Sequence, residues 1–235
     1  MWGWEEKVEL EKVMLDYVRW IFRLDFCPPR YIIMRELTME KMRVGWGIRA
    51  RRFEQRIKLG GVPTPQGILG RECWEEKENN GWGIEAREVK GGSEDFEELV
   101  NKERDLRQWE EGKIRNARYN VRYKTWETIN GTPLYLRQKN LKDWKRDEVR
   151  ALMKLRCGNL EEDNKYWIEE RRKCIFYGEG RDNITHYAME CKGIKINFKD
   201  LGREDNEILE RLWDENLDET KGAMISKLWK ERESN

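Results

Sequence analysis

The sequence contains very little of the chemistry on which most enzymes depend. Its 235 residues include a single histidine, His186, which excludes any active site that needs two histidines. It has no glycine-rich loop of the kind that binds nucleotide phosphates or dinucleotides. It also has no pair of aspartates in an apolar strand, which the two-metal chemistry of a polymerase would require. We therefore expect a protein that binds or supports other molecules and is not an enzyme.

Long apolar runs are also missing. No window approaches the roughly 18 apolar residues that a membrane-spanning helix needs, and the first residues do not form a secretory signal. These absences predict an intracellular protein, in the nucleus or the cytoplasm, without a membrane partner. The five cysteines are scattered along the chain, which indicates reduced thiols or metal ligands in preference to a disulfide framework.

The composition predicts a folded chain with a lean core. Hydrophobic residues make up 38% of the chain and charged residues 40%, but twelve tryptophans supply large apolar surfaces for burial. Apolar residues recur mostly at helical spacing, so we expect a mainly α fold of extended helical layers with a small Cys/His knuckle-like segment near the C-terminus. In residues 5–24 this pattern predicts one buried face, which consists of Leu10, Val13, Met14, Tyr17, Ile21 and Leu24 and is widened by Val18 and Trp20. The other expected helices are 31–58, 68–78, 94–130, one marked by Leu141, Trp144, Leu152 and Leu155, and 204–232 with a break at Gly222.

Basic residues are clustered although the total charge is only +1. Three stretches, 41–58, 113–124 and 137–156, carry a large excess of lysine and arginine, which is the usual pattern of phosphate contact. The second stretch also contains tyrosines that suit base stacking. A second interpretation remains open, in which these are solvated helix faces paired with acidic stretches. The candidate nucleic-acid-binding residues are Arg43, Arg49, Arg51, Arg52, Arg115, Arg118, Tyr119, Arg122, Lys124, Arg146 and Arg150.

The most distinctive stretch runs from Cys174 to Cys191. Tyr177 follows Cys174 at the spacing of a Cys-x2-Cys pair, and His186 precedes Cys191 at a His-x4-Cys spacing. With a cysteine at position 177 these residues would form a four-ligand zinc module. Two interpretations stay open: zinc held by Cys174, His186 and Cys191, with water, Cys157 or nothing in the fourth place, or a vestigial site in which Tyr177 packs where the metal-binding turn used to be. A cysteine nucleophile, Cys157 or Cys174 with His186 as its base, ranks below metal binding.

Three groups of motifs, in this order, resemble the C-terminal part of the polyprotein of non-LTR (LINE-type) retrotransposons, downstream of the reverse-transcriptase palm. One is Tyr17-Val-Arg-Trp20-Ile with Pro29-x-Tyr31, similar to the tryptophan-bearing helix pair of the thumb region. Here Pro28 and Arg30 replace the Thr and Gly of the family's turn. Another is Arg115-x3-Tyr119-Asn120 with Gly131-Thr-Pro133-x-Tyr135, similar to the linker helices. The last is Leu155-Arg156-x-Gly158-Asn159 followed by the Cys/His stretch, in which Tyr177 corresponds to a lost ligand.

The resemblance covers nearly the whole chain and implies which parts of the family's polyprotein the chain retains. The family's Tyr/Phe-x-Asp-Asp strand and its endonuclease are absent, so the resemblance implies a retrotransposon-derived fragment that binds RNA or single-stranded DNA without copying it. Two alternatives stay open, a helical structural or protein-interaction protein and a non-functional relic of a truncated element. The expected segments are a thumb-like helix pair (1–61), a loop-rich connector (62–93), a helical linker with basic faces (94–156), a degenerate zinc-knuckle-like segment (157–201) and a C-terminal helix (202–235).

Overall fold

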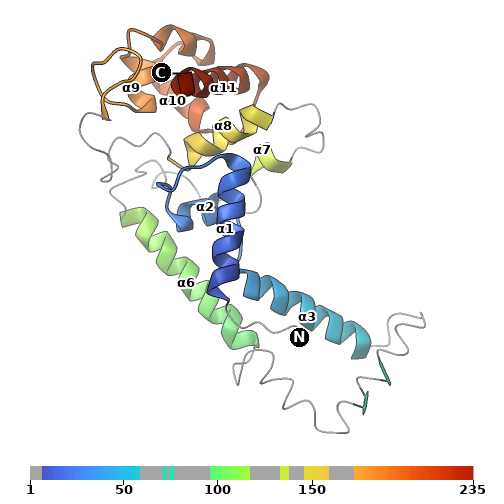
Figure 1. Ribbon diagram of the computed structural model, residues 1–235. Coiled ribbons are helices and arrows are strands. Elements are labelled where there is room, and N and C mark those ends of the chain that lie inside the picture. The colour runs from blue at the N-terminus through green and yellow to red at the C-terminus, as the bar shows by residue number, and fades with distance from the viewer. Residues whose placement is uncertain are drawn as a thin grey trace. The chain divides into compact units, whose positions relative to one another are not determined.

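The computed structural model describes residues 7–58, 71–72, 75–76, 96–116, 133–137, 146–158 and 172–234 (Figure 1). Every element named within these ranges is a helix, which confirms the mainly α fold. No helix in the same ranges is both long and apolar enough to cross a membrane. The elements are α1 (Val8–Phe22), α2 (Arg30–Glu36), α3 (Met42–Lys58), α6 (Phe96–Asn116), α7 (Leu134–Arg137), α8 (Arg146–Arg156), α9 (Ile184–Met189), the 3₁₀ helix η3 (Lys195–Leu201), α10 (Asp205–Trp213) and α11 (Glu219–Ser234).

The chain divides into two compact units, each made of separated segments. Unit 1 takes residues 1–15 and 40–111, and unit 2 takes residues 16–39 and 112–235. In unit 1 the carboxylate of Glu11, only 2% exposed, accepts a hydrogen bond from the Met42 amide at 2.6 Å. This bond satisfies one of the free N–H groups at the start of α3. Unit 2 contains the Cys/His segment and helices α2 and α7 to α11.

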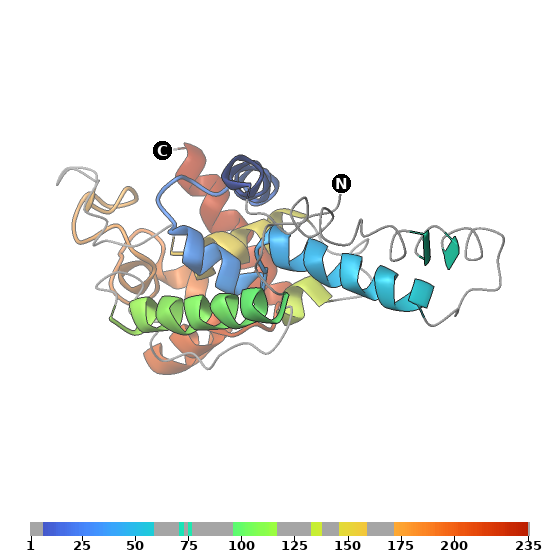
Figure 2. The ribbon, with the colours of Figure 1, turned by 90° about the horizontal axis from the view of Figure 1, so that it is seen from below.

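Helix α8 is the centre of unit 2. Its residues from Glu148 to Arg156 are buried with the exception of Arg150, and α11 lies beside it (Figure 1, Figure 2). The two helices approach closely at Gly222, where an added Cβ would lie 2.7 Å from Oε2 of Glu148. Other extensive contacts of this unit join α9, η3 and α10 to each other and η3 to α11.

A buried polar network joins α2, α7 and α8. The carboxylate of Glu36 is fully buried and accepts hydrogen bonds from the Tyr135 hydroxyl at 2.8 Å and from the guanidinium of Arg156. Arg156 also donates to the carbonyl of Trp213. Gly158, with φ of 82°, takes the left-handed conformation just after α8 ends. The Leu-Arg-x-Gly motif thus contributes an internal ion pair and a helix stop.

The structure corrects two predicted helix boundaries. Residues 31–58 form two helices instead of one, because the chain leaves the helical conformation after Leu37 and Thr38 adopts a φ of 49°. The break in the last helix precedes Gly222: α10 ends at Trp213, and Asp218 caps the start of α11 by accepting from the Lys221 amide at 2.8 Å. Most of 68–78, all of 117–130, Leu141 and Trp144 lie outside the described residues.

The predicted inner face of α1 is wrong in part. Val18 and Leu24 of the predicted set are buried, but Val13 and Tyr17 are 63% and 59% exposed and Leu10 and Trp20 are exposed as well, whereas Leu15, outside the set, is buried. Apolar residues occur on more than one side of this helix, so the pattern alone did not determine which side is buried. The ring of Tyr17 instead stacks on that of Trp20, with ring centroids 5.9 Å apart, at the surface.

Candidate metal centre

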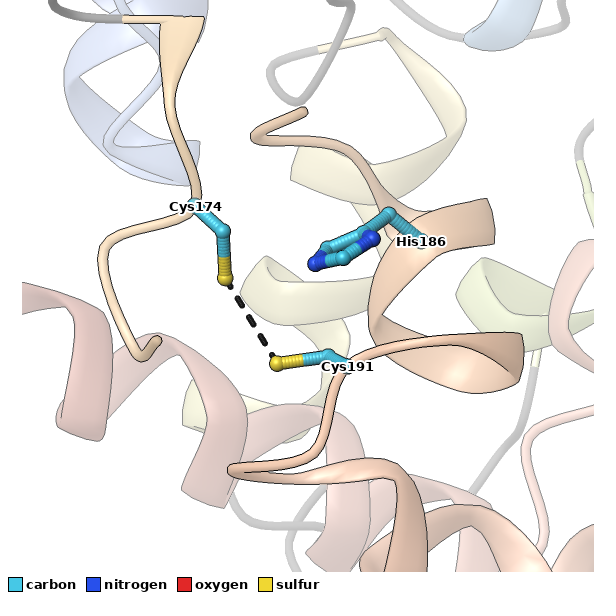
Figure 3. Close-up of side chains that lie close together, drawn as sticks. All are labelled: Cys174, His186 and Cys191. Atoms are coloured by element: carbon cyan, nitrogen blue, oxygen red, sulfur yellow. Dashed lines mark hydrogen bonds between the residues drawn. The ribbon is translucent and has the colours of Figure 1, made fainter. Parts of the chain in front are cut away.

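Three side chains predicted as metal ligands come together in unit 2. The sulfur atoms of Cys174 and Cys191 and a ring nitrogen of His186 all lie within 4.8 Å of one another, and all three residues are buried. Figure 3 shows the two thiols and the imidazole directed toward a common point. The two sulfurs are 3.5 Å apart, and both thiols are free. Two thiolates on a tetrahedral zinc would be about 3.8 Å apart, given Zn–S bonds of about 2.3 Å.

A short hairpin carries Cys174. The carbonyl of Gly180 accepts from the Cys174 amide at 3.1 Å, and the Gly178 amide donates to the carbonyl of Cys174 at 2.8 Å. Lys173 and Arg181 pair as an antiparallel bridge at the open end of the hairpin. The tight turn requires left-handed residues, and Gly178 and Gly180 have φ of 75° and 74°. The hairpin places the sulfur of Cys174 against α9.

The start of α9 positions His186. The side chain of Asn183 caps the helix by accepting from the His186 amide at 2.7 Å. On the ring, Nδ1 lies 3.2 Å from a carboxylate oxygen of Glu190, one helical turn later. An added Cβ at Gly180 would lie 2.3 Å from Cε1 of His186, so the glycine leaves room for the imidazole. Cys191 follows α9 directly, and its amide bonds to the His186 carbonyl at 2.8 Å.

The Nε2 atom of His186 has no hydrogen-bond partner within the part of the chain that the structure describes, although it is buried. Buried polar atoms without a partner are rare in folded proteins and call for a physical explanation. A proton on Nδ1 that is donated to Glu190 leaves the lone pair of Nε2 free. Carboxylates commonly orient metal-binding histidines in this way. The orphaned nitrogen beside two thiols therefore fits a metal ligand.

The thiol of Cys174 has a perturbed acidity. Burial raises its pKa, and the neighbouring Cys191 thiol raises it further, while the backbone N–H groups of Phe176 and Tyr177 lower it by hydrogen bonding to the sulfur. Such N–H donors stabilise a thiolate. Because a metal binds only the thiolate, we expect binding at this centre to release protons and to weaken as the pH falls.

A buried ion pair fixes the base of the hairpin to the last helix. The carboxylate of Asp182 receives both terminal nitrogens of Arg232 from α11, each at 2.7 Å, and the hydroxyl of Tyr187. Burial raises the pKa of Tyr187 far above its usual value, so its hydroxyl stays protonated and donates. Asp182 precedes α9 and Tyr187 follows His186, so this cluster holds the segments on both sides of the imidazole.

Tyr177 and Cys157 do not join the three ligands. The Tyr177 side chain is 42% exposed, and its hydroxyl accepts from the amine of Lys192 at 3.2 Å. It therefore lies at the surface and does not fill the metal-binding turn. The sulfur of Cys157 lies 3.8 Å from that of Met153 in the buried part of α8 and is not a member of the donor group.

The predicted nucleic-acid contacts lie on several elements. Arg49 and Arg52 are exposed on α3, and Arg115 is exposed on α6, while Arg43 is half-buried. On α8, Arg146 is exposed, but Nε of Arg150 donates to the carbonyl of Ile21 at 2.7 Å and therefore has a structural role. The side chain of Arg51 and the residues Arg118, Tyr119, Arg122 and Lys124 lie outside what the structure describes.

Sequence reasoning missed a basic and aromatic surface on the Cys/His segment itself. The amine of Lys192 lies 5.0 Å from the centre of the Tyr177 ring, and Ile175 is 37% exposed in the same turn. Lys173 and Arg181 are exposed at the open end of the hairpin. Residues 172–199 contain six basic and three acidic residues, and one of the acids, Asp182, is buried in its ion pair. This charge excess can be counted in the sequence.

The chain was compared with protein-family models, curated proteins and solved structures. No protein-family model, no curated protein and no solved structure matches the chain.

Proposed function

We propose that the chain is a zinc-containing helical module that binds single-stranded nucleic acid. The observation that carries the proposal is the convergence of Cys174, His186 and Cys191 around a buried imidazole nitrogen without a partner. Two thiolates and one imidazole form a donor set that suits zinc. A water molecule completes the tetrahedron, because neither Cys157 nor Tyr177 belongs to the donor group.

The metal's role in this proposal is structural. Zinc would join the hairpin, α9 and the segment that leads to η3. With three protein ligands the affinity falls below that of a four-ligand site, whose binding free energy is about 10–16 kcal/mol. No catalytic step is proposed for the bound water.

Metal analysis tests this part of the proposal. We expect about one zinc per chain after purification without chelators, and binding of cobalt(II) with the intense visible absorption of tetrahedral thiolate coordination. Cys191→Ser should abolish both signals. The matched control is Cys27→Ser, because Cys27 is a free thiol outside the donor group. Protein free of metal, with no cobalt spectrum, would contradict the proposal.

The nucleic-acid part of the proposal rests on the Tyr177 surface, defined here as Tyr177, Lys192, Lys173 and Arg181. The exposed Tyr177 ring with the amine of Lys192 beside it offers base stacking together with phosphate contact, and Lys173 and Arg181 of the same hairpin are exposed as well. The resemblance to LINE-type retrotransposons points to the same ligands, and it remains a proposal based on the sequence motifs alone.

A salt titration with a short single-stranded RNA or DNA tests this surface. We expect binding that weakens steeply with salt, and a loss of about 1–3 kcal/mol in Tyr177→Ala from the missing stack. Lys192→Gln should reduce the salt slope, whereas Lys227→Gln, an exposed lysine of α11, should not. Absence of nucleic-acid binding at low ionic strength would contradict the nucleic-acid part of the proposal and leave the zinc part standing.

A protein-interaction role is the second candidate, and the exposed apolar side chains of α1 favour it. Val13, Tyr17 and Trp20 follow one another at intervals of four and three residues, and Trp20 is 73% exposed. Such a stripe is typical of a helix that packs on another helix. Light scattering distinguishes the candidates: a discrete oligomer that Tyr17→Glu converts to a monomer supports this role, and a monomer at all concentrations argues against self-association.

A further inference from the structure

A small pocket in unit 2 carries an excess of positive charge. It has a volume of about 70 Å³ and lies among the end of α1, α8 and α11. Since one water needs about 10–15 Å³ by this measure, the pocket has room for roughly five to seven water-sized atoms. Its charged lining consists of Arg23, Arg150, Lys154, Lys230, Asp147 and Glu233, four cations against two anions.

The two acidic side chains form only weak ion pairs with the basic side chains of the pocket. Lys154 meets Glu233 at 3.3 Å, and Asp147 lies 3.7 Å from Arg150 and 3.8 Å from Lys230. Both acids are about half exposed, and exposed ion pairs of this length contribute little to stability. They leave room for a stronger anion.

Arg23 is the cation whose position most needs an explanation. It follows α1 with a φ of 51°, a conformation that costs an L-residue free energy. Its guanidinium has no hydrogen bond or ion pair with any other residue that the structure describes, although it lines the pocket. The bond from Arg150 to the Ile21 carbonyl holds the end of α1 on α8 and so places Arg23 at the pocket.

The deeper wall is rigid and supplies further donors. Lys154 is 8% exposed, and its amine lies 4.7 Å from the centre of the Trp229 ring. The indole N–H of Trp229 donates to the Ala151 carbonyl at 3.1 Å, which fixes the ring. Ser226, also buried, adds a hydroxyl to the lining. A preformed pocket of this size with two surplus positive charges suits a small, doubly charged oxyanion.

We propose that this pocket binds a phosphate group, with Arg23 and Lys230 as its outer and Lys154 as its inner cation. A phosphate has five heavy atoms and up to two negative charges at neutral pH, and it accepts several charge-assisted hydrogen bonds. The inference does not depend on the metal or on the Tyr177 surface. The phosphate comes either from a free phosphorylated molecule or from the end of a nucleic-acid strand.

Two-dimensional ¹H–¹⁵N NMR of the full chain tests the pocket through the indole N–H of Trp229. The signal is assigned with Trp229→Phe. We expect inorganic phosphate to shift it saturably, and chloride at the same ionic strength to leave it in place. The double variant Arg23→Gln/Lys230→Gln should weaken phosphate binding by more than about tenfold, because it removes two charge-assisted contacts and each is worth about tenfold or more. Both residues are exposed, so the variant should keep its fold.

The matched control is Arg203→Gln, an exposed arginine of unit 2 that does not line the pocket. Equal weakening by the control, or no saturable shift with any phosphate, would overturn the inference. Oligonucleotides with and without a 5′-phosphate separate the two sources. Saturation by inorganic phosphate supports a free phosphorylated ligand, whereas saturation by the 5′-phosphorylated strand alone assigns the pocket to strand ends.

Discussion

Substitutions at the two glycines of the hairpin distinguish the cost of backbone strain from the cost of crowding the His186 ring. Both have φ near 75°, but a Cβ at Gly178 would meet no atom within 4 Å, whereas a Cβ at Gly180 would overlap the His186 ring. We predict that Gly178→Ala costs about 1–2 kcal/mol of stability, the price of a left-handed L-residue, and leaves metal binding intact. Gly180→Ala should cost the same strain and also displace the imidazole.

Cobalt(II) titration of both variants measures the difference. The affinity of Gly180→Ala should fall by at least about tenfold, in line with changes that misplace a ligand, while Gly178→Ala stays near wild type. If both variants lose the metal equally, the backbone conformation of the turn matters more than the space around His186.

Position 177 lies in the same turn as Cys174, at the spacing of a Cys-x2-Cys pair. The amides of Phe176 and Tyr177 hydrogen-bond to the Cys174 sulfur, and the Tyr177 side chain makes its contact with Lys192 at the surface. We predict that Tyr177→Cys completes a Cys-Cys-His-Cys site and strengthens zinc binding by several orders of magnitude, because a fourth thiolate replaces water. Competition with a chelator measures the gain.

Ile175→Cys is the control for that variant, because it adds a thiol in the same turn at a position that is 37% exposed. It should change zinc affinity little. A similar gain in zinc affinity from both variants would show that a thiol at either position of the turn can bind the metal. Position 177 would then have no special geometry.

At the scale of elements, the ion pair between Asp182 and Arg232 links α11 to the metal centre. Removing one partner of a buried pair leaves the other charge without compensation, which typically costs 3–5 kcal/mol. We predict that Arg232→Gln destabilises the chain by about 3 kcal/mol and also weakens zinc binding, since Asp182 and Tyr187 hold the segments on both sides of His186. Urea unfolding and zinc titration measure the two effects.

Lys227→Gln provides the control on the same helix, because its ion pair with Glu231 is exposed and spans a single turn. Its free energy of unfolding should stay within about 0.5 kcal/mol of wild type. Lost stability with unchanged zinc affinity in Arg232→Gln would mean that α11 supports the fold without ordering the ligands.

The elements also show how far sequence reasoning reached. Spacing alone predicted that Cys174, His186 and Cys191 form a group that could hold a metal ion, because a Cys and a His-x4-Cys pair can be recognised in the sequence without knowledge of the fold. It did not predict that Glu190 orients the imidazole, since an exposed glutamate one turn from a histidine is common on any helix. It placed Leu10, Val13 and Tyr17 wrongly on the buried side of α1, and it placed the break in the last helix too late, at Gly222. Tertiary packing determines which side of α1 is buried. The hydrogen bond that Asp218 accepts from the Lys221 amide is a local capping interaction, and it determines where α11 begins.

At the scale of the whole molecule, a buried lysine makes stability depend on pH. Lys221 is fully buried, and its amine donates to the carbonyls of Asp214 and Asn216 at 2.6 and 3.0 Å. Burial lowers the pKa of Lys221 to about 8, although the charges of Asp214 and Asp218 raise it and those of Arg156 and Arg211 lower it further. In the unfolded chain the pKa returns to about 10.4.

The sign follows from proton binding. Between pH 8 and about 10 the unfolded chain binds more protons at this lysine than the folded chain, so its contribution to stability rises with pH in that window. Below pH 8 both states are protonated, and the folded state carries the full unfavourable term. We predict that the free energy of unfolding of wild type, relative to Lys221→Met, increases by about 2 kcal/mol from pH 7.5 to 9.5.

Urea denaturation at several pH values, with Lys227→Met as a control on the same helix, tests the prediction. Measuring the difference from Lys221→Met removes the opposing contribution of Cys174, whose raised pKa makes stability fall at high pH in wild type and variant alike. The control should follow wild type at every pH, because Lys227 is 61% exposed. A difference between wild type and Lys221→Met that stays constant from pH 7.5 to 9.5 would show that Lys221 keeps an ordinary pKa. In that case its two carbonyl partners and the neighbouring carboxylates of Asp214 and Asp218 would fully offset the effect of its burial.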